Sequence, residues 1–174
     1  MRRRSALVSA FVVAFGVFVS GAGATAPNSE AASYEFHLEA PNVAMAPNGD
    51  TFAVTGMGAF SVHPKSAGGG GSWTHTFAGG GSASGTWTAT GLVAFQPYGC
   101  GVVFGTPIPP NFCGGRLVLD VTLSTPGGSV PAKLTIYCLI GAPPASASEG
   151  IRLVVPGVIN FNKVVGGDNI YIKR

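Results

Sequence analysis

Residues 117–140 have the sequence LVLDVTLSTPGGSVPAKLTIYCLI, and this stretch decides the fold. In residues 117–124, leucine or valine at every second position alternates with mostly polar residues. A period of two places one side of a strand in the core and the other side toward water. Pro126 and the two glycines after it favour a turn, and residues 134–140 then alternate again. The stretch therefore predicts two antiparallel strands joined by a tight turn.

The rest of the chain repeats this pattern in short segments that glycine and proline separate, with 27 Gly and 13 Pro among 174 residues. Because no apolar pattern has a helical period over a useful length, we expect an all-β domain with almost no helix. The further strands are predicted at residues 34–39, 42–46, 51–55, 60–63, 72–77, 82–88, 151–155, 158–164 and 170–173.

One sheet of about eight to ten short strands must curl, close or split into two layers, because open edges invite aggregation. We therefore expect residues 34–174 to form a single antiparallel β-barrel. A two-sheet β-sandwich is the alternative.

Two tryptophans flank a glycine-rich tip. Glycines 68–71 predict a flexible connection, and glycines 79–81 predict a three-residue hairpin loop. In the register that this loop implies, Trp73 lies opposite Trp87, and His75 shares their face.

The N-terminus has the order of a secretory signal peptide: Arg2 to Arg4, an apolar run over residues 6–19, then small residues. We expect cleavage after residue 24 or 26, which leaves residues 27–33 as a flexible lead-in. The alternative, a retained membrane anchor, needs roughly 20 apolar residues to cross the bilayer, and this run is shorter. The chain is therefore expected to be secreted.

Charge excludes one class of partner. Loss of Arg2 to Arg4 leaves seven lysines and arginines against seven acids, so the processed chain has no net charge. Nucleic acid is not an expected partner, because phosphate neutralisation needs a dense cationic face. No later apolar run has membrane-spanning length, so no transmembrane segment is expected after cleavage.

The chain has three cysteines, so at most one internal disulfide can form. Cys100 and Cys113 flank a proline-rich segment, and we favour a bridge between them. Cys138 lies on the apolar face of residues 134–140, which predicts a buried thiol. A bridge from Cys138 to one of the other two is the alternative. The spacings lack a zinc knuckle, so no metal site is expected.

Glu35, His37 and Glu39 share one face of a predicted strand. Two carboxylates and an imidazole could serve proton transfer, and a raised pKa inside a barrel mouth would make either glutamate an acid or base. The alternative is a solvated face that discourages edge pairing. We assign no catalytic residue, and no Gly-x-Ser-x-Gly motif is present.

Trp73, His75 and Trp87 form the second candidate group. An aromatic surface facing glycine suits a small apolar ligand or a sugar ring. The alternative is that both tryptophans are simply part of the core.

Several segments resemble a group of uncharacterised secreted bacterial β-rich proteins: residues 84–89, 98–101, 134–141 and 149–163. The resemblance implies export and a β-rich domain. It brings no assigned activity, cofactor or catalytic residue.

We therefore expect a secreted β-barrel module that binds a ligand or partner, or serves structurally, without catalysis or cofactor. One alternative is a small-molecule isomerase or cyclase with a barrel pocket. Another is a cell-envelope or adhesion protein, which would expose a large apolar patch. A cavity of about 300 Å3 or more that contains His75 or Glu35 would favour a carrier or an enzyme over a solid interior.

Overall fold

The computed structural model describes residues 32–174, which form an all-β domain without a helix. The predicted signal peptide and residues 27–31 of the predicted lead-in lie outside the described residues. Eleven strands follow one another in the described residues: β1 (Ser33–Met45), β2 (Thr51–Ser61), β3 (Ser66–Thr76), β4 (Ser82–Cys100), β5 (Val102–Val103), β6 (Thr106–Pro107), β7 (Phe112–Thr125), β8 (Gly128–Cys138), β9 (Gly150–Val155), β10 (Ile159–Phe161) and β11 (Lys163–Lys173). No helix in this part of the chain is long and apolar enough to cross a membrane.

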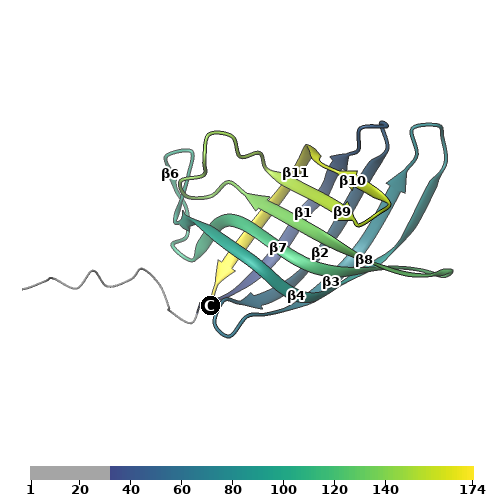
Figure 1. Cartoon of the computed structure of the whole chain (residues 1–174). Helices are drawn as coiled ribbons and strands as arrows, with labels where there is room; N and C mark the ends of the chain where they lie inside the picture. The colour runs from purple at the N-terminus through teal and green to yellow at the C-terminus, as the bar shows by residue number, and fades with distance from the viewer. Residues whose placement is uncertain (1–31) are drawn as a thin grey trace, which may run out of the picture.

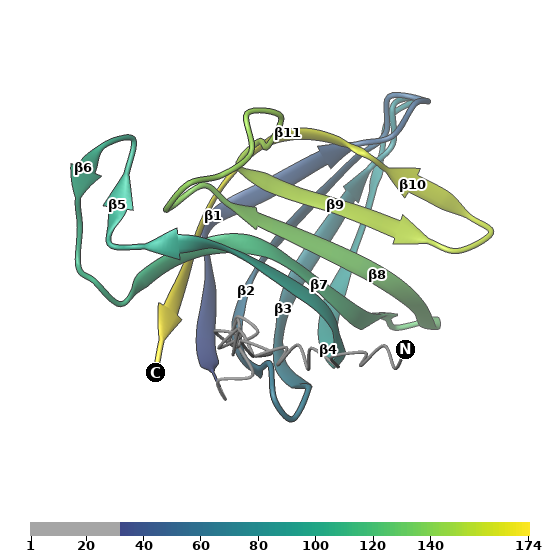
Figure 2. The same ribbon diagram turned by 60° about the vertical axis from the view of Figure 1, so that its left-hand side comes forward.

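Nine of the strands form one antiparallel sheet, in the order β10-β9-β8-β7-β11-β1-β2-β3-β4 (Figure 1). A further pairing of β4 with β7 closes six of them, β7, β11, β1, β2, β3 and β4, into a ring. The remaining strands β8, β9 and β10 continue the sheet from β7, and β9 approaches β11 and β1 (Figure 2). The predicted all-β antiparallel class is confirmed, with six strands in the ring.

The ring has one weak junction, between β7 and β11, which pair through only two residue pairs. Beyond these pairs β8 takes the place beside β7, and side chains bridge β8 and β11. Tyr171 on β11 donates from its hydroxyl to the backbone oxygen of Ile136 at 2.9 Å. We call the junction of β7 with β11, together with the adjoining border between β11 and the end of β8, the seam; it places polar groups at the edge of the interior.

The predicted hairpin around Pro126 is confirmed. Strands β7 and β8 pair so that Leu117 lies opposite Ile136 and Leu119 opposite Leu134, and all four side chains are buried. They join an aromatic core in which Phe36, Phe60, Trp87 and Tyr171 are each at most 2% exposed.

Some predicted segments merge into longer strands. Residues 34–39 and 42–46 belong almost entirely to β1, and residues 51–55 run without a break into 60 and 61 in β2. The register of β1 against β2 shifts between Leu38 and Asn42. Pro41 lies in this shift, where a residue without an N–H is tolerated.

The prediction that glycines 68–71 form a flexible connection is wrong. All four lie within β3 and pair with residues of β2. A Cβ atom built on Gly71 would lie 2.6 Å from the Cα of Gly56, so the absence of a side chain is what lets the two strands approach.

The predicted register of the next hairpin is also wrong, by two residues. Trp73 lies opposite Gly85, and Trp87 opposite Gly71, because the connection between β3 and β4 spans residues 77–81 instead of three glycines. The observed register puts each indole opposite a glycine. A Cβ on Gly85 would lie 2.9 Å from the Trp73 ring.

Candidate functional site

Glu35, His37 and Glu39 lie together on β1, and they alternate with buried residues that face the core. His37 Nε2 lies 3.9 Å from Glu35 Oε2, and His37 Nδ1 lies 4.0 Å from Glu39 Oε1. A hydrogen bond from Arg174 is the main reason that the pKa of Glu35 is lowered. A carboxyl that is stabilised in its charged form is poorly suited to general acid chemistry.

The second predicted group is divided. Trp87 is 1% exposed and lies in the core, where its indole N–H donates to the backbone oxygen of Thr55 at 2.9 Å. Trp73 and His75 instead line a cavity of about 390 Å3, which we call the aromatic cavity. Sequence alone could not separate the two tryptophans, because both face the same side of the sheet.

The aromatic cavity lies between the ring and the strands β8 to β10. Phe52 stacks on Trp73, with ring centroids 5.4 Å apart, and Phe161 lies against Phe52 at 5.2 Å. The exposed side chains of Val130 and Val158 also line it. These rings and aliphatic groups offer an apolar surface that suits a flat or aliphatic ligand.

His75 is the titratable side chain among the lining residues of this cavity. Its Nε2 lies 2.9 Å from Asp50 Oδ2, and Asp50 Oδ1 accepts the backbone N–H of Ala78 at 2.9 Å. These hydrogen bonds, that of Ala78 first, lower the pKa of Asp50. Because a carboxylate can only accept, Nε2 carries the proton, and in the neutral imidazole Nδ1 is an acceptor.

A second cavity, of about 550 Å3, was not predicted from sequence. Its lining contains three acidic side chains, Glu39, Glu149 and Asp168, and we call it the acidic cavity. Apolar side chains of the β5–β6 hairpin and of β11 complete its wall.

Glu149 belongs to the seam. Its carboxylate accepts the backbone N–H of Leu139 at 2.7 Å and that of Asn169 at 3.0 Å. Burial raises the pKa of Glu149 to about 7, although both hydrogen bonds oppose the shift, and the charge of Asp168 adds to it. No motif surrounds Glu149, so only the folded chain shows that this carboxyl is half-buried.

Asn169 extends the same network. Its Nδ2 donates to Asn42 Oδ1 at 2.8 Å and to the backbone oxygen of Tyr137 at 2.9 Å. Its Oδ1 is buried and has no hydrogen-bond partner within residues 32–174, although buried polar atoms are nearly always paired. Asn169 also lines the acidic cavity.

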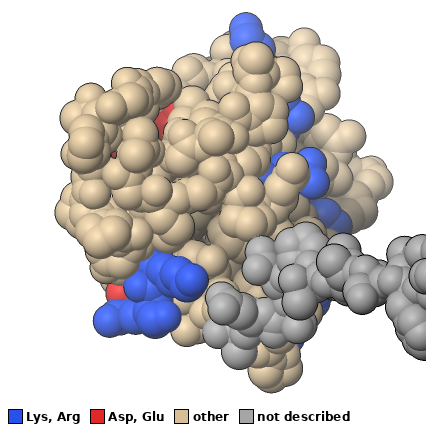
Figure 3. Space-filling view, turned by 90° about the vertical axis from the view of Figure 1, so that its left-hand side faces the viewer, with Lys and Arg blue, Asp and Glu red and all other residues tan. Residues whose placement is uncertain are grey.

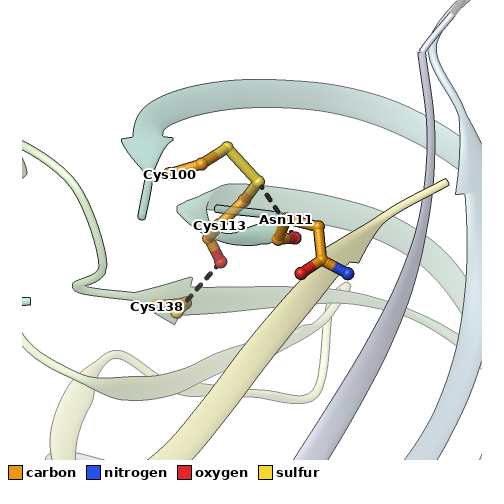
Figure 4. Close-up of a disulfide and its surroundings, with 4 residues drawn as sticks. All are labelled: Cys100, Asn111, Cys113 and Cys138. Atoms are coloured by element: carbon orange, nitrogen blue, oxygen red, sulfur yellow. Dashed lines mark hydrogen bonds between the residues drawn. A yellow bond between two sulfur atoms is a disulfide. The ribbon is translucent and has the colours of Figure 1, made fainter. Parts of the chain in front are cut away.

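The predicted disulfide between Cys100 and Cys113 is confirmed (Figure 4). The two cysteines lie opposite each other on β4 and β7. Cys138 is free and buried, and its thiol lies 3.5 Å from the backbone oxygen of Cys113. Burial raises the pKa of Cys138 to about 12, so the reactive thiolate is suppressed.

Comparisons of the chain with models of protein families, with curated proteins and with solved structures found no match.

Proposed function

We propose that this chain is an exported binding module that holds a small, mostly apolar ligand in the aromatic cavity, without catalysis of its own. The observation that carries the proposal is the cavity of about 390 Å3 lined by Phe52, Trp73, His75 and Phe161. Ligand sites are typically hollows of roughly this size, mostly apolar and with few polar groups.

The walls favour an apolar body with one hydrogen-bond donor. Stacked aromatic rings gain from contact with a flat ligand, and Phe52, Trp73 and Phe161 supply that contact. His75 is fixed through Nε2 by Asp50, so its Nδ1 is available to accept from a ligand hydroxyl or N–H. Val158 is 75% exposed, which gives the cavity an apolar rim.

Export is the second part of the proposal. The charged, apolar and small-residue order of residues 1–26 supports it. The disulfide between Cys100 and Cys113 is compatible with it, because such bonds persist mainly in oxidising compartments.

The test is a titration with N-phenyl-1-naphthylamine, an uncharged aromatic probe that fluoresces in apolar surroundings and carries one N–H. We expect saturable binding that Val158→Lys weakens by about tenfold, since a charge at the rim opposes entry of an apolar molecule. Val165→Lys is the matched control, because Val165 is also an exposed valine but lines neither cavity. Equal weakening by both variants, or no saturable binding, would overturn the proposal.

A further inference from the structure

The acidic cavity lies at the other end of β7 from the aromatic cavity. Phe112, the first residue of β7, lines the acidic cavity, whereas Leu123 and Thr125 near the end of that strand line the aromatic one. The two cavities share no lining residue. Any ligand of the acidic cavity is therefore independent of the function proposed above.

Three acids, Glu39, Glu149 and Asp168, line this cavity. Within residues 32–174, no lysine or arginine pairs with these acids, and His37 Nδ1 lies 4.0 Å from Glu39 Oε1. On the face that carries the β5–β6 hairpin, Figure 3 shows an acidic residue in a recess of uncharged residues, apart from the lysines and arginines. Glu39 and Asp168 are exposed and Glu149 is half-buried, and three carboxylates that line one hollow beside apolar side chains attract a cation.

An unsatisfied acceptor lies in the same wall. Asn169 is 3% exposed, and its Oδ1 has no partner among the described residues. The amide orientation is fixed, because Nδ2 already donates to Asn42 Oδ1 and to the backbone oxygen of Tyr137. The atom that lacks a partner is thus an acceptor, and an N–H group of a ligand is the kind of partner it lacks.

Phe104 adds an apolar surface at the outer side of the cavity. Its side chain is 83% exposed, and its backbone has a φ of 48°, in the left-handed region that a bulky residue rarely occupies. Such backbone conformations cost free energy and cluster at ligand-binding sites. An exposed aromatic ring beside carboxylates suits a ligand that is both cationic and apolar.

A bare metal ion fits this arrangement less well. Within the described part of the chain, no three His, Cys, Asp or Glu side chains lie close enough together to hold one. The cavity has a volume of about 550 Å3, which leaves room for the body of an organic cation beside its charged group. An ammonium group is a compact cation with several N–H donors.

We propose that the acidic cavity binds a small organic ammonium ion with an apolar body. Its ammonium group lies among the carboxylates of Glu39, Glu149 and Asp168, and its apolar body lies against Phe104 and Phe112.

Benzylamine is the probe that tests this. In calorimetric titrations at about pH 8, where Glu149 with a pKa of about 7 is mostly charged, we expect saturable binding of benzylamine and none of benzyl alcohol. The double variant Glu39→Gln, Asp168→Asn should bind benzylamine at least about tenfold more weakly, because two attractive charges are gone. Asp120→Asn, which removes an acid outside the cavity, should bind it unchanged.

Three outcomes would overturn the proposal: absence of benzylamine binding, equal affinity for benzyl alcohol, or equal weakening by the double variant and by Asp120→Asn. Displacement of benzylamine by an equimolar concentration of calcium chloride would also overturn the proposal, because the cavity would then be a site for a metal ion. Val158→Lys should retain benzylamine binding, so failure of the aromatic cavity and failure of this site are distinguishable.

A second variant tests the apolar contact. Phe104→Gly removes the ring and suits a φ of 48°, so the hairpin keeps its conformation. We expect it to bind benzylamine about three- to tenfold more weakly while the thermal midpoint does not fall. Unchanged affinity would remove Phe104 from the site and would contradict the placement of the apolar body.

Discussion

The indole N–H of Trp87 on β4 reaches across β3 and donates to the backbone oxygen of Thr55 on β2, at 2.9 Å. Gly71 lies between them, paired with Trp87 on one side and with Gly56 on the other. A Cβ on Gly56 would lie 2.8 Å from the Trp87 ring. The glycines in this row are therefore part of the core packing.

The first prediction separates two glycines of the same run. Gly71→Ala should lower the free energy of unfolding by at least about 2 kcal/mol, because the added methyl meets the backbone of β2. Gly68→Ala should stay within about 0.5 kcal/mol of the parent, because nothing lies within 4 Å of the atom added there. Urea unfolding followed by tryptophan fluorescence measures both. Similar losses for the two variants would contradict the packing role of Gly71.

The second prediction concerns the disulfide. Cys100 and Cys113 are 13 residues apart. The double change to serine should lower the free energy of unfolding by about 3 kcal/mol, because the unfolded chain regains the conformational freedom that the disulfide removes. Thermal unfolding with and without dithiothreitol checks the pairing. Cys138→Ala should remain sensitive to the reductant, like the parent, whereas the double variant should not respond. A Cys138→Ala protein that ignores the reductant would contradict the pairing.

The third prediction concerns pH. The pKa of Glu149 is about 7 in the folded chain, against an ordinary value of 4.5, so the folded state binds the proton more tightly. The contribution of this tighter proton binding to the free energy of unfolding is fully present below pH 4.5 and is lost as the pH rises through 7. Because this carboxyl is partly exposed, we expect the loss to reach at most about 2 kcal/mol.

Urea unfolding across this range, compared with Glu149→Gln, isolates the effect. Asp168 and Tyr171 of β11, Cys138 of β8 and Glu39 of β1 are the other titratable groups near this carboxyl. Glu39→Gln is the control and should keep the parent slope. A parent whose stability changes with pH as that of Glu149→Gln does would contradict a raised pKa.

Alternation was a sufficient signal for the β7–β8 hairpin. Each apolar residue of residues 117–123 has the same local pattern around it, and Pro126 fixes where the chain turns. The disulfide could be predicted from composition, because the proline-rich segment between Cys100 and Cys113 forms a loop whose two ends lie together. Local chemistry decides both features.

The glycine-rich strand failed for the opposite reason. Glycine has low strand propensity, and residues 68–71 have no side chains with which to show a period of two. Contacts with other strands hold them in β3: all four pair with residues of β2, and Gly71 also pairs with Trp87 of β4. The local sequence of these glycines does not show that an aromatic ring from another strand packs beside them.

Glu149 could not have been found in this way either. Its burial depends on the approach of β11 to the end of β8, two segments about 30 residues apart in the chain. The predicted trio on β1 was visible because its members are neighbours in sequence. The acidic cavity combines Glu39 of that trio with residues from four other parts of the chain.

The seam described above also bears on local opening of the folded domain. A full ladder of backbone hydrogen bonds must break one rung at a time, whereas β8 and β11 are joined by a handful of side-chain bonds from Glu149, Asn169 and Tyr171. We therefore expect partial opening of the domain to begin there and to leave the paired strands intact. Glu149 and Asn169, which join these two segments, also line the acidic cavity, so local opening there would change the shape of that cavity.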